Sequence, residues 1–179
     1  MGTRNMTLVV KDGVRKVAQY CQWDGYPTGQ GADICRFLQE DLDLRKFKKA
    51  LDECKFVDEK VIHERWMECG ADGSGFVDSE ISGKFLKKFP QFHRDTGADI
   101  LKLIQDEEVR ELQDAYPEEG DGTWIEYSYI VDVDKKKLFV YRGMVDLKDP
   151  EAGLWKSYSF KSATPKAMSV LENGEGEED

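Results

Sequence analysis

The feature that most constrains the fold is an alternating run near the C-terminal end of the chain. From Ile125 to Val133, five apolar or aromatic residues on one side alternate with Glu, Ser, Ile and Asp on the other. This period of two is that of a β-strand. Residues 134–137 turn the chain and residues 138–141 return. A second hairpin is predicted near the N-terminal end, where residues 6–10 and 14–20 flank an Asp-Gly turn.

The residues between the two hairpins show helical periodicity. Apolar residues recur three and four positions apart in the segments 34–38, 44–51, 57–66, 81–89 and 100–112. Pro90 ends the fourth segment, and Thr96–Asp99 is similar to a capping box at the start of the fifth. Nearer the C-terminal end, residues 155–160 favour a further strand, and Thr164-Pro165 favours a short helix through Leu171.

These elements predict the fold class and the domain organisation. We expect a single α+β domain over residues 1–171, with an antiparallel sheet built from the N-terminal and C-terminal hairpins. The helical middle is expected to pack on one face of that sheet. Residues 172–179, which are mostly Gly and acidic residues, are expected to form a disordered acidic tail.

Composition and charge narrow the function classes. The formal net charge is −10, so direct binding of nucleic acid is not expected, because phosphate neutralisation by Lys and Arg dominates that affinity. No apolar run is long enough to span a membrane and no signal peptide is recognisable. We therefore expect a cytoplasmic protein whose four cysteines, which form no CxxC pair, are reduced thiols.

The strongest candidate site is the segment that follows the N-terminal hairpin. It supplies amides, aromatic rings, a carboxylate and glycines, from Gln19, Gln22, Trp23, Asp24, Gly25, Tyr26, Gly29, Gln30 and Gly31. Arg4 and Asn5 begin the neighbouring strand and are expected nearby. This set could grip a small polar ligand or an amide-rich peptide. The alternative is that Trp23 and Tyr26 cap the core and that Asp24-Gly25 is only a turn.

Catalytic and metal chemistry find weaker support. His93 could act as a general base oriented by Asp95, with Arg94 beside them. The simpler alternative is that Asp95 caps the next helix and Arg94 pairs with a nearby carboxylate. Thr3 could serve as an N-terminal nucleophile only after a further cut. Residues 71–78 do not form an EF-hand calcium loop, because with Gly75 at the sixth position Gly70 and Ile81 fall at positions one and twelve, where carboxylates are needed. Neither a metal nor a cofactor is predicted.

An acidic stretch offers a second kind of site. Asp106, Glu107, Glu108 and Glu111 lie close together in the sequence. Closely spaced carboxylates can imitate phosphates toward a basic, nucleic-acid-binding protein, so these residues form a candidate acidic partner-binding face. The alternative is an ordinary solvated surface.

Several motifs resemble one family of uncharacterised proteins encoded by phages, prophages and scattered bacterial genomes. The resemblance covers roughly residues 2–142 and is carried by Gly2-Thr-Arg-Asn5, Val17-Ala-Gln-Tyr20, Gln22-Trp-Asp-Gly-Tyr-Pro27, Gly29-Gln-Gly31, Arg94-Asp-Thr-Gly-Ala98 and the hairpin 127–141. It implies a mobile-element protein that acts in the cytoplasm of a bacterial host. Cys21 replaces the family's usual glycine, which argues against a catalytic role for this thiol.

These observations predict an accessory protein, more a binder than an enzyme, that binds and inhibits a host factor. That factor would be an anti-phage defence enzyme directed at nucleic acid, as in an anti-CRISPR-like mechanism. The alternative is a small hydrolase or a small-ligand-sequestering protein that uses the 19–31 loop. The oligomeric state is left open.

Overall fold

A five-stranded sheet forms the centre of the molecule. The computed structural model describes residues 2–117 and 121–174. The strands are β1 (Asn5–Lys11), β2 (Val14–Cys21), β5 (Tyr127–Asp132), β6 (Lys137–Arg142) and β7 (Leu154–Ser159), in the order β2-β1-β5-β6-β7. The two predicted hairpins and the predicted strand near residue 155 are therefore confirmed, and the fold is α+β.

The two hairpins meet at the centre of the sheet in a way that the sequence did not predict. All neighbouring strands are antiparallel except β1 and β5, which run parallel from the pair Asn5 and Tyr127 to the pair Val10 and Asp132. Alternation fixes which side chains share a face, but it leaves the direction of a neighbouring strand open. The predicted antiparallel sheet is thus mostly, but not wholly, antiparallel.

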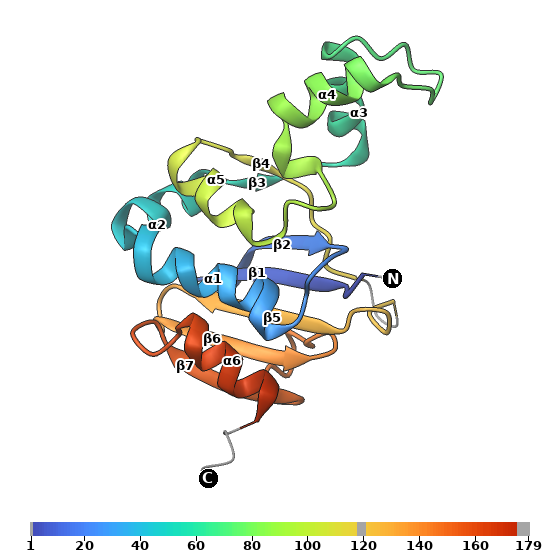
Figure 1. Cartoon of the computed structure of the whole chain (residues 1–179). Helices are drawn as coiled ribbons and strands as arrows, with labels where there is room; N and C mark the ends of the chain where they lie inside the picture. Colours follow the sequence, from blue (N-terminus) through green and yellow to red (C-terminus); the bar gives the residue numbers. More distant parts are fainter. Residues whose placement is uncertain (1, 118–120, 175–179) are drawn as a thin grey trace.

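Four helices cover one face of this sheet, which we call the helix face (Figure 1). They are α1 (Ala32–Arg36), α2 (Leu44–Glu53), α5 (Ile100–Asp106) and α6 (Pro165–Asn173). The short helical turns η1 (Pro27–Gly31), η2 (Phe37–Asp41), η3 (Pro90–Phe92) and η4 (Gly97–Asp99) connect them to the rest of the chain. Alternate strand residues such as Val9, Tyr129 and Leu138 pack there against helix residues such as Phe47 and Leu101.

The opposite face, which we call the loop face, is covered differently. Met6, Leu8, Ile130 and Tyr141 point to this side and pack against the irregular segments 115–116, 125 and 144–147. The alternation within β5 and β6 therefore separates two cores, one covered by helices and one covered by connecting loops. The predicted strand began too early, because Ile125 precedes β5 and packs on the loop face rather than beside Tyr127 and Tyr129.

Two helices project beyond the sheet as a helical arm, the segment 55–92 (Figure 1). The arm contains α3 (Glu59–Glu68) and α4 (Ser79–Lys88), and its own core is formed by Trp66, which stacks on Phe85 at 3.6 Å, with Phe89 beside them. The two-residue strands β3 (Lys55–Phe56) and β4 (Glu111–Leu112) pair at its base. Within the part of the chain that the structure describes, no helix is long and apolar enough to cross a membrane.

The helix starts follow the local sequence, with one exception. The side chains of Asp43, Asp58, Asp78 and Thr164 each accept a hydrogen bond from the backbone N–H three residues later, which is the N-cap arrangement. The predicted helix start at Thr164-Pro165 is thus confirmed. The predicted capping box at Thr96 is wrong, because Thr96 already has helical dihedral angles and its hydroxyl donates to the carbonyl of Pro90.

The last helix extends into the segment that was expected to be a tail. Helix α6 continues through Asn173, and the carboxylate of Glu172 accepts a hydrogen bond from the backbone of Thr28 at 2.8 Å. These residues of the expected tail therefore belong to the domain. Residues 175–179 lie outside the described residues.

Candidate functional site

The predicted loop after β2 closes on the chain itself. The backbone N–H of Gly25 donates to the carbonyl of Thr3 at 3.0 Å, and that of Gln30 donates to the carbonyl of Asp24 at 2.7 Å. A Cβ atom on Gly25 would lie 2.6 Å from Thr3 O, and one on Gly29 would collide with the carbonyl of Asp24. These glycines permit close contact between neighbouring backbones, and the space they leave is filled by the protein rather than open to a ligand.

Asn5 holds three parts of this region together. Its side chain is fully buried, and Nδ2 donates to the carbonyls of Thr3, Cys21 and Trp23 at 3.1–3.2 Å. The amide thus joins the start of β1, the end of β2 and the loop that follows. This is a structural role, because a fully buried side chain cannot be reached by a partner without unfolding.

Gln30 and Tyr129 close the loop from the inside. Gln30 donates to the Cys21 sulfur at 3.7 Å and accepts from the backbone of Ala98 at 2.8 Å. The hydroxyl of Tyr129 donates to the carbonyl of Gly25 at 2.6 Å. Burial raises the pKa of the Cys21 thiol, which makes it a poor nucleophile. The inner side of the loop is therefore packed against the rest of the domain.

The outer side of the same loop presents aromatic and polar groups. Trp23 is 43 % exposed and Trp124 is 39 % exposed. The ring of Tyr20 meets Trp124 edge to face at 5.1 Å, and its hydroxyl donates to the Gln22 side chain at 2.7 Å. The exposed carboxylate of Asp24 accepts from the hydroxyl of Tyr26 at 3.0 Å.

A small pocket lies beside these groups, at the outer edge of β2, where the backbone N–H of Ala115 donates to the carbonyl of Ala18. Its volume is about 210 Å³ and its walls include Gln19, Tyr20, Gln91, Phe92, His93, Arg94, Gln113 and Trp124. Gln19 donates to the carbonyl of Gln91 at 3.3 Å, whereas the buried Oε1 of Gln91 has no hydrogen-bond partner in the structure. The pocket thus combines aromatic rings with amide and basic groups.

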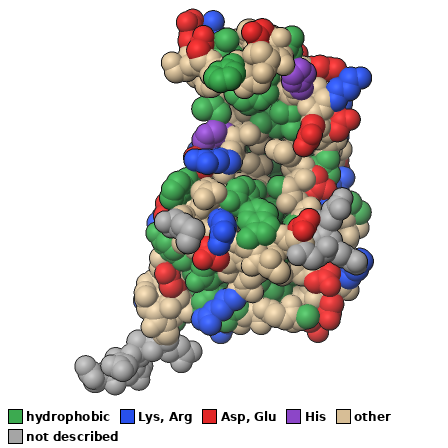
Figure 2. Space-filling view, turned by 90° about the vertical axis from the view of Figure 1, so that its right-hand side faces the viewer, with side chains coloured by type: hydrophobic (Ala, Val, Ile, Leu, Met, Phe, Trp, Pro, Cys, Tyr) green, Lys and Arg blue, Asp and Glu red, His purple; other side chains and the backbone are tan. Residues whose placement is uncertain are grey.

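We call the exposed surface around this pocket the sheet-end face. It consists of Tyr20, Gln22, Trp23, His93, Arg94 and Trp124. Figure 2 shows the molecule from this end, where hydrophobic side chains lie among basic, acidic and histidine side chains. Sequence reasoning missed Gln91, Gln113 and Trp124, because no local pattern marks a residue whose partners lie far away along the chain.

The remaining predicted residues, Arg4, Arg94 and Asp95, form ion pairs within the protein. The backbone N–H of Arg4 donates to the Glu126 carboxylate at 2.9 Å, and its side chain lies 4.0 Å from the same oxygen. The Asp95 carboxylate lies 3.3 Å from Nε of Arg94 and 4.0 Å from Nε2 of His93. Arg94 is therefore paired with a carboxylate, as the simpler alternative predicted, while Asp95 caps no helix because Thr96 and η4 intervene.

His93 is not arranged as a general base. Its Nδ1 accepts a hydrogen bond from the backbone N–H of Asp95 at 3.3 Å, so in the neutral ring the proton sits on Nε2. No cysteine thiol lines the pocket with it. Cys35 and Cys54 lie elsewhere, and burial raises their pKa values to about 12 and about 11.

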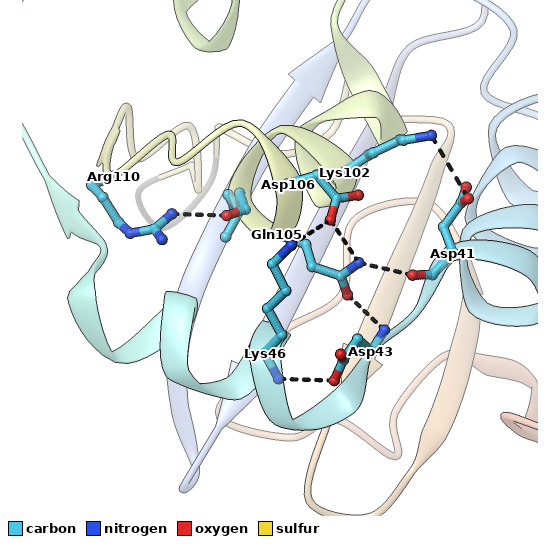
Figure 3. A network of polar contacts seen from close by, with 8 residues as sticks. Asp41, Asp43, Lys46, Lys102, Gln105, Asp106 and Arg110 are labelled. Atoms are coloured by element: carbon cyan, nitrogen blue, oxygen red, sulfur yellow. Dashed lines mark hydrogen bonds and ion pairs between the residues drawn. The ribbon is translucent and has the colours of Figure 1, made fainter.

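The predicted acidic face is partly neutralised by the protein's own cations. Asp106 lies 3.0 Å from Nζ of Lys46, and this contact lowers the pKa of the Asp106 carboxyl. It belongs to a network in which Gln105 joins Asp106 to the backbone around Asp41 and Asp43 (Figure 3). Hydrogen bonds of this kind hold the α2–α5 contact.

Of the other three predicted acidic residues, one is paired with a cation and two are not. Glu111 accepts two hydrogen bonds from the guanidinium of Arg65, at 3.0 and 2.8 Å. Glu107 and Glu108 are exposed, and neither forms an ion pair within the described ranges. Of the four predicted acidic residues, Glu107 and Glu108 are therefore the two that form no ion pair within the described part of the chain.

No group of three or more His, Cys, Asp or Glu side chains that could hold a metal ion occurs among residues 2–117 and 121–174. Comparison with known proteins adds no further assignment to this site. The chain matches no protein-family model, no curated protein sequence and no solved structure.

Proposed function

We propose that this chain is a non-enzymatic accessory protein of a phage or other mobile element that binds and inhibits a bacterial host protein through its sheet-end face. The observation that carries the proposal is a pair of exposed tryptophans at this end of the sheet. Trp124 lines the pocket with Arg94, and Trp23 follows Gln22, whose side chain accepts a hydrogen bond from the pocket residue Tyr20. Trp, Tyr and Arg are the residue types that contribute most to binding energy in protein interfaces.

Buried hydrogen bonds hold the loop beneath this surface in place, and this rigidity favours binding. Asn5, Gln30 and Tyr129 fix the loop from below through hydrogen bonds to four backbone carbonyls and one backbone N–H. A surface held in place before binding loses less conformational entropy when a partner arrives. The closed inner side of the loop thus supports the recognition function of its outer side.

The charge of the chain favours a basic partner. The formal net charge is −10, and opposite charges accelerate the encounter of two proteins. Enzymes directed at nucleic acid carry basic surfaces because they neutralise phosphates, so a defence enzyme of this class fits the charge. Contact is expected to be made by the aromatic sheet-end face, since Asp106 and Glu111 are already paired.

A pull-down from bacterial lysate with matched variants tests this function. Trp124→Ala combined with Arg94→Ala removes two exposed groups of the sheet-end face, whereas Phe76→Ser removes the 90 % exposed aromatic ring of the distant arm. We expect the wild-type chain and Phe76→Ser to capture the same host protein, and the double variant to lose it. The captured enzyme, once purified, should be inhibited by the wild-type chain only. Equal capture by all three proteins contradicts the proposal.

A second candidate function is sequestration of a small polar ligand in the pocket beside β2. It is favoured by the buried Oε1 of Gln91, which has no hydrogen-bond partner, at a pocket that also carries Arg94. Mass spectrometry of small molecules released from the purified protein tests this candidate. A stoichiometric ligand that disappears in Gln91→Leu supports it, and a protein purified without any such molecule contradicts it.

A further inference from the structure

A second cavity lies on the loop face and shares no lining residue with the pocket of the sheet-end face. Its volume is about 370 Å³, which lies within the range of about 300–1,000 Å³ typical of small-molecule sites. None of its lining residues belongs to the 19–31 loop or to the acidic stretch. The proposed function therefore assigns no role to this cavity.

Strand alternation builds the floor of this cavity. Val10 of β1, Ile130 of β5 and Phe139 and Tyr141 of β6 all point to the loop face, and Leu154 begins β7 beside them. The register places Val10 next to Asp132 and Ile130 opposite Phe139. The floor is thus a continuous apolar surface that spans four strands.

A loop rather than a helix forms the roof. Leu147, Pro150 and Glu151 line the cavity from above. The roof is fixed at two points, because the hydroxyl of Tyr141 donates to the carbonyl of Pro150 and the backbone N–H of Leu147 donates to the hydroxyl of Tyr116 at 3.0 Å. This loop is held above the sheet without filling the space beneath it.

Three carboxylates line this cavity, and Asp132 is the buried one, whereas Asp134 and Glu151 are exposed. Asp132 is 9 % exposed, and its Oδ1 accepts from the backbone N–H groups of Asp134 and Lys135 at 3.1 and 2.9 Å. Its Oδ2 has no donor within the described parts of the chain. Oδ2 is not among the fully buried polar atoms that lack a hydrogen-bond partner, so it keeps contact with solvent and is open to a cationic or N–H donor group.

The cations that line the cavity do not supply that partner. Arg15 is bound through two hydrogen bonds to Asp114, and its guanidinium lies 4.5 Å from the centre of the Tyr116 ring. Lys135 lies 5.9 Å from the centre of the Phe139 ring and forms no ion pair that the structure records. The ring of Phe139 therefore already accommodates one cation by a cation–π contact.

We propose that this cavity binds a small amphipathic amine. The apolar body of the amine would lie on Ile130, Phe139 and Leu154, and its ammonium group would donate to Oδ2 of Asp132. The negative net charge of the chain favours a cationic ligand over an anionic one. No covalent step is involved, so the site is one of binding alone.

Three probes of equal length test the proposal on the full chain: n-hexylamine, hexan-1-ol and hexanoate, each titrated by calorimetry. We expect the amine to bind at least about tenfold more tightly than the alcohol, which corresponds to one charge-assisted hydrogen bond. Hexanoate should bind weakest. If the alcohol or hexanoate equals or exceeds the amine, or if no probe binds, the proposal is wrong.

Two variants and one control test whether the amine binds in this cavity. Asp132→Asn keeps an oxygen for the backbone N–H groups of Asp134 and Lys135, and it should lower amine affinity about tenfold without changing alcohol binding. Leu154→Trp fills the cavity and should abolish binding of both the amine and the alcohol.

Asp149→Asn is the control, because it removes one exposed charge of the roof segment that does not line the cavity. An equal loss in Asp149→Asn and Asp132→Asn would mean general attraction to an acidic protein and would overturn the site. If a variant fails to fold, the order of the three probes on the wild-type chain still tests whether the protein prefers an amine, and an order without that preference overturns the proposal.

Discussion

The two faces of the sheet are made from the same strands but are covered in different ways. On the helix face, Leu138 and Val140 of β6 are fully buried beneath helices. On the loop face, Phe139 of the same strand is only partly buried and lines a cavity of about 370 Å³. A helix presents a continuous apolar stripe that can interlock with a sheet, whereas a loop must also satisfy its own backbone groups and leaves gaps.

This difference separates stability from binding. The helix face contains the larger buried cluster, and cores packed to high density carry most of the folding free energy. The two cavities described above lie on the loop face and at the end of the sheet, where Trp124 is also exposed. We therefore expect substitutions on the helix face to act on stability and those on the loop face to act on binding.

Two leucines provide the most direct test of this comparison. Leu138→Ala removes a fully buried side chain from the helix face and should lower the free energy of unfolding by about 2–5 kcal/mol, because a large-to-small change leaves a void. Leu154→Ala, at a side chain that is partly buried beside an existing cavity, should lower it by about 1 kcal/mol or less. Urea denaturation monitored by circular dichroism measures both values. Equal losses would contradict the comparison.

Two tyrosine hydroxyls extend the test from apolar to polar contacts. Tyr129→Phe leaves the buried carbonyl of Gly25 without its donor and should lower stability by about 1–3 kcal/mol, the cost of an unsatisfied buried group. Tyr141→Phe frees the carbonyl of the exposed residue Pro150. Water can replace the lost donor there, so the loss should stay near about 0.5–1 kcal/mol. Urea denaturation measures both losses. A larger loss in Tyr141→Phe than in Tyr129→Phe would contradict the comparison.

The pH dependence of stability should show that the core on the helix face excludes water. Burial raises the pKa of Cys35 from 9.0 to about 12, so the folded protein keeps the thiol neutral while the unfolded chain ionises it. The stability from this group is complete below pH 9.0 and is lost between pH 9.0 and about 12. Cys35→Ala should reduce the slope of unfolding free energy against pH by up to about 1.4 kcal/mol per unit in that window. An unchanged slope would show that the thiol is hydrated.

The smallest effect is expected in the helical arm, which belongs to neither face. Glu111→Gln weakens the paired hydrogen bonds to Arg65 at the base of the arm. Both side chains are about one-quarter exposed, so the loss in global stability should be no more than about 1 kcal/mol. Hydrogen exchange should accelerate in α3 and α4 while β5 is unchanged. Faster exchange in β5 would mean that the arm and the sheet unfold as one unit.

The fold was largely accessible to sequence reasoning, and the candidate site only in part. Alternation located both hairpins, and helical spacing located the helices, while the Asp N-caps at 43, 58 and 78 were found only in the structure. Trp23 and Arg94 were singled out from residue type alone, and the structure places both on the exposed sheet-end face. Asn5 and Gln30 were also singled out, but their amides turn inward to backbone groups. Residue type cannot distinguish an amide that binds a ligand from one that binds the chain.

The sequence by itself determined which side chains share a face, where the turns fall and where most helices begin, because these properties depend on neighbours a few residues apart. Only the tertiary structure decided that β1 and β5 run parallel, that Arg65 and Lys46 neutralise Glu111 and Asp106, and that Asp132 faces an apolar cavity under the segment 147–151. Each of these facts depends on contacts between residues far apart along the chain, and local periodicity carries no record of such contacts.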